Sequence, residues 1–329
     1  MIIPTRKGSY CPDGDFYIDP ICPVSRAIIT HGHYDHARRG HEHILCSERS
    51  KKILDYRLKP KSIQTCRFGE TIKISNVNVT LYPASHILGA SQIKIESAKN
   101  GIWLYTGDFR VTSDSSCDDF ENVKTDFLVS ESTFGLPVFR WPDQKSVFES
   151  FASWWLKNVV DGVNSILYCY SLGKAQRVLV ALKEFLGEES FFSKIFCHDS
   201  ICEINKIYLN SGIKLPDIYK LSELKPTSAS LVLLPPSCLG VYSNSKLGSH
   251  REAMMSGWMM IRGYSKRQQN CQRFVLSDHA DWNQINNVVK SSFAEQIYLL
   301  HGYTDTLAKH LCEQGFNAES FYKKHCKNE

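Results

Sequence analysis

The chain has 329 residues, a length that suits two domains or one large one. Hydrophobic residues make up 43% and charged residues 22% of the sequence, which excludes a disordered or fibrous protein. The 39 Lys and Arg residues against 34 Asp and Glu give a net charge of +5. Such a small positive balance permits nucleic-acid binding but does not by itself indicate it.

Two features of the sequence bear on its compartment. The N-terminal residues lack the apolar stretch of a secretory signal, and no segment approaches the roughly 18 apolar residues of a membrane span. The twelve cysteines are scattered and include no C-x-x-C pair, as is typical of reduced thiols. We therefore expect a cytoplasmic protein without a membrane partner.

Short apolar runs between polar turns predict strands through the first part of the chain, at 16–19, 27–30, 78–82, 92–96, 102–106 and 127–130. Turn residues at 135–137 and 141–142 then interrupt this pattern. Beyond them, apolar spacing predicts helices at 146–160 and 173–186 and strands at 165–170, 231–234, 274–276 and 297–300. We expect an α/β chain in which 137–270 forms a unit of its own, between segments 1–136 and 271–329.

Potential metal ligands crowd into the loop that follows the predicted strand 27–30. His31, His33, Asp35 and His36 fall within six positions. Side chains so close together can be presented from one tight turn and can serve two adjacent metal ions. Four such residues in one loop are hard to explain as ordinary surface or core histidines.

Three further candidate ligands lie where predicted strands end. His86 follows the strand at 78–82, Asp108 follows 102–106 and His301 follows 297–300. Because α/β folds collect their sites at the carboxyl ends of strands, we expect these side chains to join the first group.

The order of these residues resembles the metal site of the metallo-β-lactamase superfamily, in which H-x-H-x-D-H is followed by a His, by G-D and by a late H-G. The run E-S-T-F-G at 131–135 and the run S-D-H-A-D at 277–281 resemble motifs of the β-CASP nucleases within that superfamily. The segments at 134–137, 154–155, 235–237, 256–259 and 281–282 make the chain most like the bacterial ligase-associated DNA exonucleases.

This resemblance implies a metallo-β-lactamase αββα sandwich, formed by 1–136 and 271–329, with a small α/β β-CASP-like domain inserted at 137–270. It also implies two metal sites that share Asp108. The first ion would take His31, His33, His86 and Asp108, and the second would take Asp35, His36, Asp108 and His301. Asp19 resembles the aspartate that supports the site from an early strand. Nitrogen and oxygen ligands fit zinc, with manganese as the alternative.

The sequence also offers candidate residues for proton transfer and for substrate binding. His279 is the candidate proton donor to the leaving oxygen, and Glu131 would orient it, while Asp35 and Asp108 would act as metal-binding carboxylates. Phosphate contacts are expected at a predicted helix start and in the acid-free stretch 253–277. The residues concerned are Ser171, Lys174, Arg177, Arg262, Lys266 and Arg267.

The resulting hypothesis is a metal-dependent DNA exonuclease that hydrolyses phosphodiester bonds with a hydroxide activated by two metal ions, in DNA repair. The expected substrate is single-stranded DNA or DNA with single-stranded ends, and the family suggests work beside a DNA ligase and a helicase. An RNA-processing nuclease of the same fold is the main alternative. A small-molecule ester or thioester hydrolase is less favoured, because the motifs at Glu131 and His279 argue against it.

Overall fold

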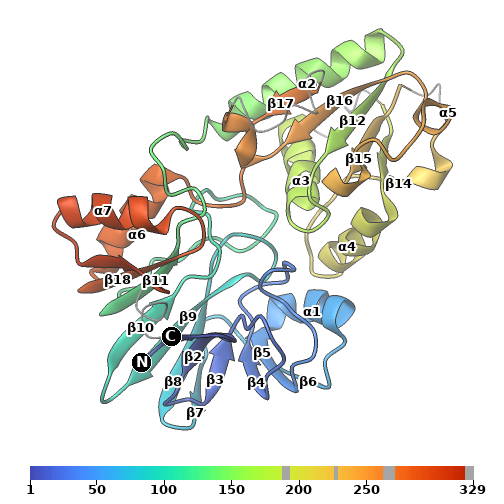
Figure 1. The fold of residues 1–329 in the computed structure, drawn as a ribbon. Coiled ribbons are helices and arrows are strands. Elements are labelled where there is room, and N and C mark those ends of the chain that lie inside the picture. The colour runs from blue at the N-terminus through green and yellow to red at the C-terminus, as the bar shows by residue number, and fades with distance from the viewer. Residues whose placement is uncertain (187–192, 226–228, 262–270, 323–329) are drawn as a thin grey trace. The chain divides into compact units, whose positions relative to one another are not determined.

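The computed structural model of the chain describes residues 1–186, 193–225, 229–261 and 271–322 (Figure 1). It divides into two compact units. The first contains Met1–Ser113, Cys117–Arg140 and His279–Glu329, and the second contains Asp114–Ser116 and Trp141–Asp278. No helix in the described ranges has the length and apolar character needed to cross a membrane.

Two β-sheets form the centre of the first unit. One has six strands, which pair in chain order: β1 (Ile3–Thr5), β2 (Gly8–Cys11), β3 (Phe16–Ile18), β4 (Arg26–Ile28), β5 (His43–Ser47) and β6 (Ser62–Cys66). The other has seven strands in the order β19-β18-β11-β10-β9-β8-β7. Their bounds are β7 (Thr71–Ile74), β8 (Val77–Pro83), β9 (Ser91–Ser97), β10 (Gly101–Tyr105), β11 (Phe127–Glu131), β18 (Gln296–Leu300) and β19 (Ala318–Ser320).

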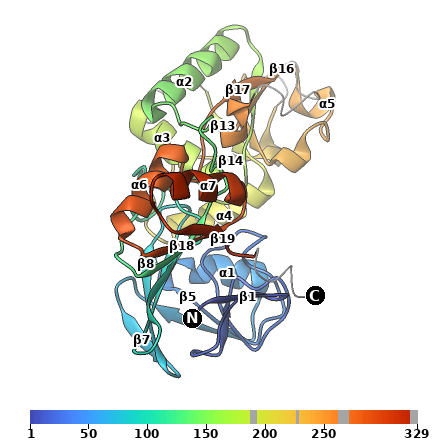
Figure 2. The same ribbon diagram turned by 60° about the vertical axis from the view of Figure 1, so that its left-hand side comes forward.

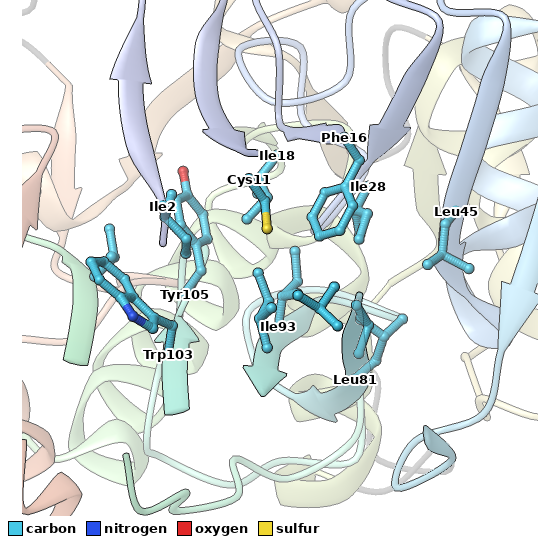
Figure 3. Packing of buried hydrophobic residues seen from close by; sticks show 14 of the residues in the cluster. Ile2, Cys11, Phe16, Ile18, Ile28, Leu45, Leu81, Ile93, Trp103 and Tyr105 are labelled. Carbon is cyan, nitrogen blue, oxygen red and sulfur yellow. The ribbon is translucent and has the colours of Figure 1, made fainter. Parts of the chain in front are cut away.

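The two sheets pack face to face around an apolar core (Figure 3). Phe16 and Ile28 enter this core from the six-stranded sheet, and Leu81, Ile93 and Tyr105 enter it from the seven-stranded sheet. Alternate residues of a strand point to one face, so the inward positions of β8 are Val77, Val79 and Leu81 and all of them are buried. Burial of this apolar surface holds the two sheets together.

Helices cover the outer faces. The helix α1 (Lys51–Leu58) packs Leu54 and Leu58 against Ala27 and Ile44 on the far side of the six-stranded sheet. The helix α7 (Thr304–Glu313) contacts β18 and β19, and α6 (Trp282–Ser292) lies beside α7 in both views (Figures 1 and 2). The unit is therefore a four-layer αββα sandwich, as expected from the resemblance.

The second unit is built on a sheet in which every pair of neighbouring strands is parallel. The order is β14-β13-β15-β12-β16-β17, with β12 (Asn164–Tyr168), β13 (Ile195–Cys197), β14 (Tyr219–Lys220), β15 (Leu231–Leu234), β16 (His250–Met255) and β17 (Gln272–Phe274). The described helices are α2 (Gln144–Val160), α3 (Lys174–Leu186), α4 (Asp199–Leu209) and the short α5 (Asn244–Leu247). Every residue of β12 and β15 is buried, as in a parallel sheet covered on both faces.

Each strand and helix expected from the sequence has a counterpart that overlaps it, although the strand at 274–276 was placed two residues too late. The long segment of the second unit runs from Trp141 to Asp278, compared with the expected 137–270. The segment between Leu276 and Asp278 therefore belongs with the second unit, and His279 is the first residue after the chain returns to the sandwich.

Candidate metal centre and proton donor

Asp108 lies at the centre of the candidate site, directly after β10. Its buried carboxylate oxygen Oδ2 is 3.3 Å from His36 Nε2, 3.6 Å from His31 Nε2, 3.7 Å from His86 Nε2 and 3.9 Å from His279 Nδ1. Four histidines from three separate parts of the chain thus surround one carboxylate oxygen. Asp108 is placed where a single residue could contact two metal ions.

The first expected ligand set forms a tight group. The ligand atoms of His31, His33, His86 and Asp108 all lie within 4.8 Å of one another. His86 Nε2 and His33 Nδ1 are only 2.9 Å apart. Two ligands of a tetrahedral zinc ion lie about 3.3 Å apart, given metal–nitrogen distances of about 2.0–2.1 Å. The spacing of these side chains therefore fits a small divalent cation.

Hydrogen bonds fix the protonation of His31 in the form that a metal needs. The Thr30 hydroxyl donates to Asp19 Oδ2 at 2.6 Å, because a carboxylate can only accept. The same hydroxyl oxygen lies 3.0 Å from His31 Nδ1, so Nδ1 must carry the hydrogen and donate it. Nε2 is then an unprotonated nitrogen, buried and without a hydrogen-bond partner among the residues that the structure describes. A metal ion would satisfy it.

The charge states of the group depend on its burial. Burial and the imidazoles of His36 and His86 hold the pKa of His31 well below its usual value. Burial also disfavours a charge on His36, but Asp108 and Asp19 outweigh this effect and raise the pKa of His36 well above its usual value. The His36 Nδ1–H group donates to Asp19 Oδ2 at 2.8 Å, so Nε2 is the nitrogen that faces Asp108. The raised pKa of His36 favours a proton on Nε2, where it would compete with a metal ion.

The second expected ligand set is more open. Asp35 Oδ2 lies 3.8 Å from His36 Nε2, but the Asp35 side chain is 72% exposed. The exposed His301 has its ring centroid 5.2 Å from that of His36. The structure thus places both Asp35 and His301 near His36. Among the described residues, two groups of potential ligands lie close together: His31, His33, His86 and Asp108 form one, and Asp108, Glu131 and His279 form the other. None of the three residues Asp35, His36 and His301 belongs to either group.

His279 and Glu131 form a hydrogen-bonded pair beside Asp108. Glu131 is buried at the end of β11, and its Oε1 accepts a hydrogen bond from the Phe109 backbone N–H at 2.7 Å. Its Oε2 lies 2.9 Å from His279 Nδ1, which must therefore carry the donated hydrogen. The His279 side chain is 23% exposed and its ring lies 4.7 Å from that of His86. A histidine oriented in this way can exchange a proton with a bound molecule through Nε2.

The residues expected to bind phosphate do not all lie where the sequence suggested. Lys174 and Arg177 are buried, and both form ion pairs with Asp278. Contact of these two residues with phosphate stays an untested prediction, and their burial and their pairing with carboxylates of the second unit weigh against it. The Ser171 hydroxyl, which is partly exposed, hydrogen-bonds with that of Ser200 at 2.9 Å. Arg262, Lys266 and Arg267 lie outside the described residues.

Sequence reasoning missed two residues that organise the site. The Thr30 hydroxyl donates to Asp19 and accepts from His31, so it connects the two side chains. Ser132 donates hydrogen bonds to the carbonyl oxygens of Leu300 and His301. Thr30 directly precedes His31, and Ser132 directly follows Glu131. These positions next to candidate site residues were the available signal for a role in the site. Hydroxyl side chains next to ligands often fix the ligands' orientation.

The chain was compared with known proteins. No family model matches it. The chain is 31% identical over 313 residues to a protein named "Probable DNA ligase" from Opitutus terrae, a match that covers 94% of this chain and 30% of that protein. It is 32% identical over 158 residues to RNase aCSPSF2 from Saccharolobus solfataricus, covering 46% and 31%, and 33% identical over 137 residues to endoribonuclease YSH1 from Gibberella zeae, covering 40% and 16%.

The chain spans less than a third of the length of each of these relatives. Among solved structures, a protein of unknown function from Enterococcus faecalis V583 matches with a TM-score of 0.60 and 14% identity, covering 86% of this chain and 76% of that one. This likeness concerns the fold alone. Together with the sandwich and its inserted α/β unit, these matches show that the chain belongs to the β-CASP group of the metallo-β-lactamase superfamily.

Proposed function

We propose that this chain is a metal-dependent nuclease that hydrolyses phosphodiester bonds in DNA as an exonuclease. The observation that carries the proposal is the position of Asp108, with histidine nitrogens on every side and the His279–Glu131 pair next to it. A small-molecule hydrolase would need the metal ligands. It would have no evident use for His279, a further histidine that Glu131 orients beside them.

The proposed ligands are those expected from the sequence. One ion would be held by His31, His33, His86 and Asp108, and a second by Asp35, His36, Asp108 and His301. The ions would be zinc, or else manganese. When bound, two divalent ions in such a centre activate a water molecule as nucleophile and neutralise charge on the phosphate oxygens.

The chain's own residues complete the reaction. His279 Nε2 gives its proton to the sugar oxygen as the bond from phosphorus to that oxygen breaks and the new phosphorus–oxygen bond forms. Glu131 stabilises the charged imidazole beforehand and keeps Nδ1–H directed toward itself. The two new ends would be a 5′-phosphate and a 3′-hydroxyl.

DNA is favoured over RNA by the extent of the matches. The relative named as a DNA ligase matches 94% of the chain, whereas the ribonucleases match less than half of it. We therefore propose single-stranded DNA or single-stranded ends as the substrate, repair as the setting and a DNA ligase as a functional partner. The cytoplasmic location and a helicase partner remain predictions from the sequence. RNA is the second candidate substrate, because of the ribonuclease relatives.

One cleavage assay tests the proposal. Purified chain, loaded with zinc or manganese, is incubated with DNA and RNA oligonucleotides of the same sequence, each labelled at either end. We expect a ladder of DNA products that is lost in Asp108→Ala and kept in Asp217→Ala, which removes an exposed aspartate of the second unit. Cleavage of RNA alone would support the second candidate. Cleavage of neither by metal-loaded chain would contradict a nuclease function.

A further inference from the structure

A cluster of buried charges lies in the second unit, apart from the metal ligands. It consists of Lys174 and Arg177 on α3 and the carboxylates of Asp114 and Asp278, and it is called the α3 cluster below. Lys174 is 2% and Arg177 3% exposed. Two cations and two carboxylates balance one another, so the cluster has no net charge to offer a phosphate.

Lys174 holds the segment that leads into His279. Its Nζ lies 2.9 Å from Asp278 Oδ1 and donates a hydrogen bond to the Leu276 carbonyl oxygen at 2.7 Å. One ammonium group therefore fixes both a side chain and a backbone carbonyl within three consecutive residues. His279 follows directly.

Arg177 contacts all three segments through which the chain passes between the two units. Its Nε lies 2.8 Å from Asp114 Oδ2, one residue after the chain leaves the first unit at Ser113. Its NH2 group donates to Gln144 Oε1 at 2.9 Å, three residues after Trp141, where the chain enters the second unit again.

The third segment that Arg177 contacts is 277–278, after which the chain returns to the first unit. Its NH1 group donates to the Ser277 carbonyl oxygen and, at 3.1 Å, to Asp278 Oδ1. Together with Lys174, this guanidinium fixes two successive backbone carbonyls and the carboxylate immediately before His279. The planar fork of an arginine suits several simultaneous acceptors, which a lysine cannot replace.

Stability alone is a poor reason for such a cluster. Removing charges from water costs several kcal/mol per ion, and a buried ion pair often stabilises a protein no more than well-packed apolar side chains would. What the cluster does provide is a fixed backbone path over 276–278. The acid in a proton transfer must lie within hydrogen-bond reach of its acceptor, so a displacement of about 1 Å can cost about 100-fold in rate.

We propose that Lys174 and Arg177 are positioning residues for His279. By fixing the segment from Leu276 to Asp278, they direct the His279 imidazole so that Nδ1–H meets Glu131 and Nε2 meets the leaving oxygen. Neither residue touches the substrate. This inference rests on the proposed function, because it assigns the α3 cluster to the proton transfer in that reaction.

Two substrates with different leaving groups can show whether Lys174 and Arg177 position His279 or only support the fold. A sugar oxygen needs a proton as it leaves, whereas p-nitrophenolate is stable without one. We therefore compare kcat on a DNA oligonucleotide with kcat on bis(p-nitrophenyl) phosphate, using Arg177→Lys and, as a second variant, Asp278→Asn. Bound metal and melting temperature are measured for each.

We expect both variants to lose about 10- to 100-fold in kcat on DNA and less than about 3-fold on the aryl ester, with metal content unchanged. His279→Ala should show the same split more strongly. The matched control is Arg251→Lys, which alters a partly exposed ion pair with Asp161 in the same unit and should affect neither substrate.

Equal losses on both substrates, or no loss on DNA, would overturn the positioning role while leaving the proposed function intact. If one variant does not fold, the other decides between these outcomes. A metal-loaded wild-type chain that does not cleave DNA would contradict the proposed function and, with it, the positioning role.

Discussion

Asp19 determines which nitrogen of two histidines carries a hydrogen. It accepts hydrogen bonds from the Thr30 backbone N–H at 2.8 Å, from the Thr30 hydroxyl at 2.6 Å and from His36 Nδ1 at 2.8 Å. Through Thr30 it also fixes the protonation of His31. In each histidine, Nδ1 carries the hydrogen and Nε2 faces Asp108. Nε2 is therefore the nitrogen that could bind a metal ion. One carboxylate thus sets the protonation of two candidate ligands.

Asp19→Asn should weaken metal binding about 10- to 100-fold. An amide NH2 at the position of Oδ2 would face the donors of Thr30 and His36, so His36 would have to carry its hydrogen on Nε2. Competition with a chelator measures the affinity. The control is Asp15→Asn, which changes an exposed carboxylate bonded to Tyr10. Unchanged affinity in Asp19→Asn, with affinity lost in Asp108→Asn, would show that Asp19 does not set the ligands' protonation.

The candidate metal ligands could be selected from the sequence because four of them fall within six positions and the others follow predicted strands. Lys174 and Arg177 could not be assigned in the same way. Basic residues at the start of a helix look alike in a sequence, whether they face a phosphate or a buried carboxylate. Their partner Asp278 lies about a hundred residues further along the chain, and only the folded second unit brings it to them.

At the level of secondary-structure elements, two neighbouring strands connect the candidate proton-transfer residue Glu131 to the loop that carries the candidate ligand His301. The parallel strands β11 and β18 place Glu131 opposite Leu300 in register. The next residue, Ser132, donates to the Leu300 carbonyl oxygen at 3.0 Å, and its own carbonyl accepts from the Tyr303 N–H at 3.0 Å. The loop that carries His301 is therefore attached to the end of β11.

Gly302→Ala should disrupt this junction. Gly302 has a φ of +62°, and a Cβ there would overlap the Ser132 carbonyl oxygen and lie 2.5 Å from Thr133 Cα. We expect the free energy of unfolding to fall by about 3 kcal/mol and His301 to move from the metal centre. Denaturant unfolding and bound-metal stoichiometry measure the two effects.

The matched control for this change is Gly315→Ala. Gly315 has a φ of +87°, but a Cβ there would meet no atom within 4 Å. Backbone strain alone should then cost about 1 kcal/mol and leave the metal content unchanged. Equal effects of the two substitutions would mean that the contact with Ser132 is unimportant.

Most of the predicted strands are central in their sheets and have apolar inward residues, although β5 and β16, which are also central, were not predicted. The edge strands β6 and β7 were missed because their residues alternate between exposed and half-buried positions, apart from Cys66 at the end of β6. Such strands carry polar residues such as Ser62, Gln64 and Lys73, which weaken the apolar pattern. Edge position is a tertiary property that local sequence does not record.

At the scale of the whole molecule, the sandwich is assembled from segments on both sides of the second unit. Candidate site residues occur before it, from Asp19 to Glu131, and after it, at His279 and His301. An inserted unit was expected from the turn residues and the change of pattern near 137, together with the family resemblance. Its end was less predictable, because the residues up to Asp278 belong to it through contacts with α3.

Metal binding should therefore stabilise the first unit as a whole, since its ligands come from segments far apart in the sequence. At a free metal concentration about 100 times Kd, binding adds about 2.7 kcal/mol to the free energy of unfolding, which corresponds to a rise in Tm of about 5–10 °C for a unit of this size. Calorimetry with zinc added after chelation measures the shift. Asp108→Ala should abolish the shift and Asp217→Ala should retain it.

The rise in Tm caused by metal binding should become smaller as the pH falls. The pKa of His36 is raised in the metal-free fold, so a proton competes with the metal for Nε2. Below that raised pKa metal binding must release the proton, and the Tm rise should shrink as the pH falls. Above it the nitrogen is already available, and the rise should reach a plateau. A Tm rise independent of pH from acid to neutral conditions would mean that the metal binds elsewhere than at His36.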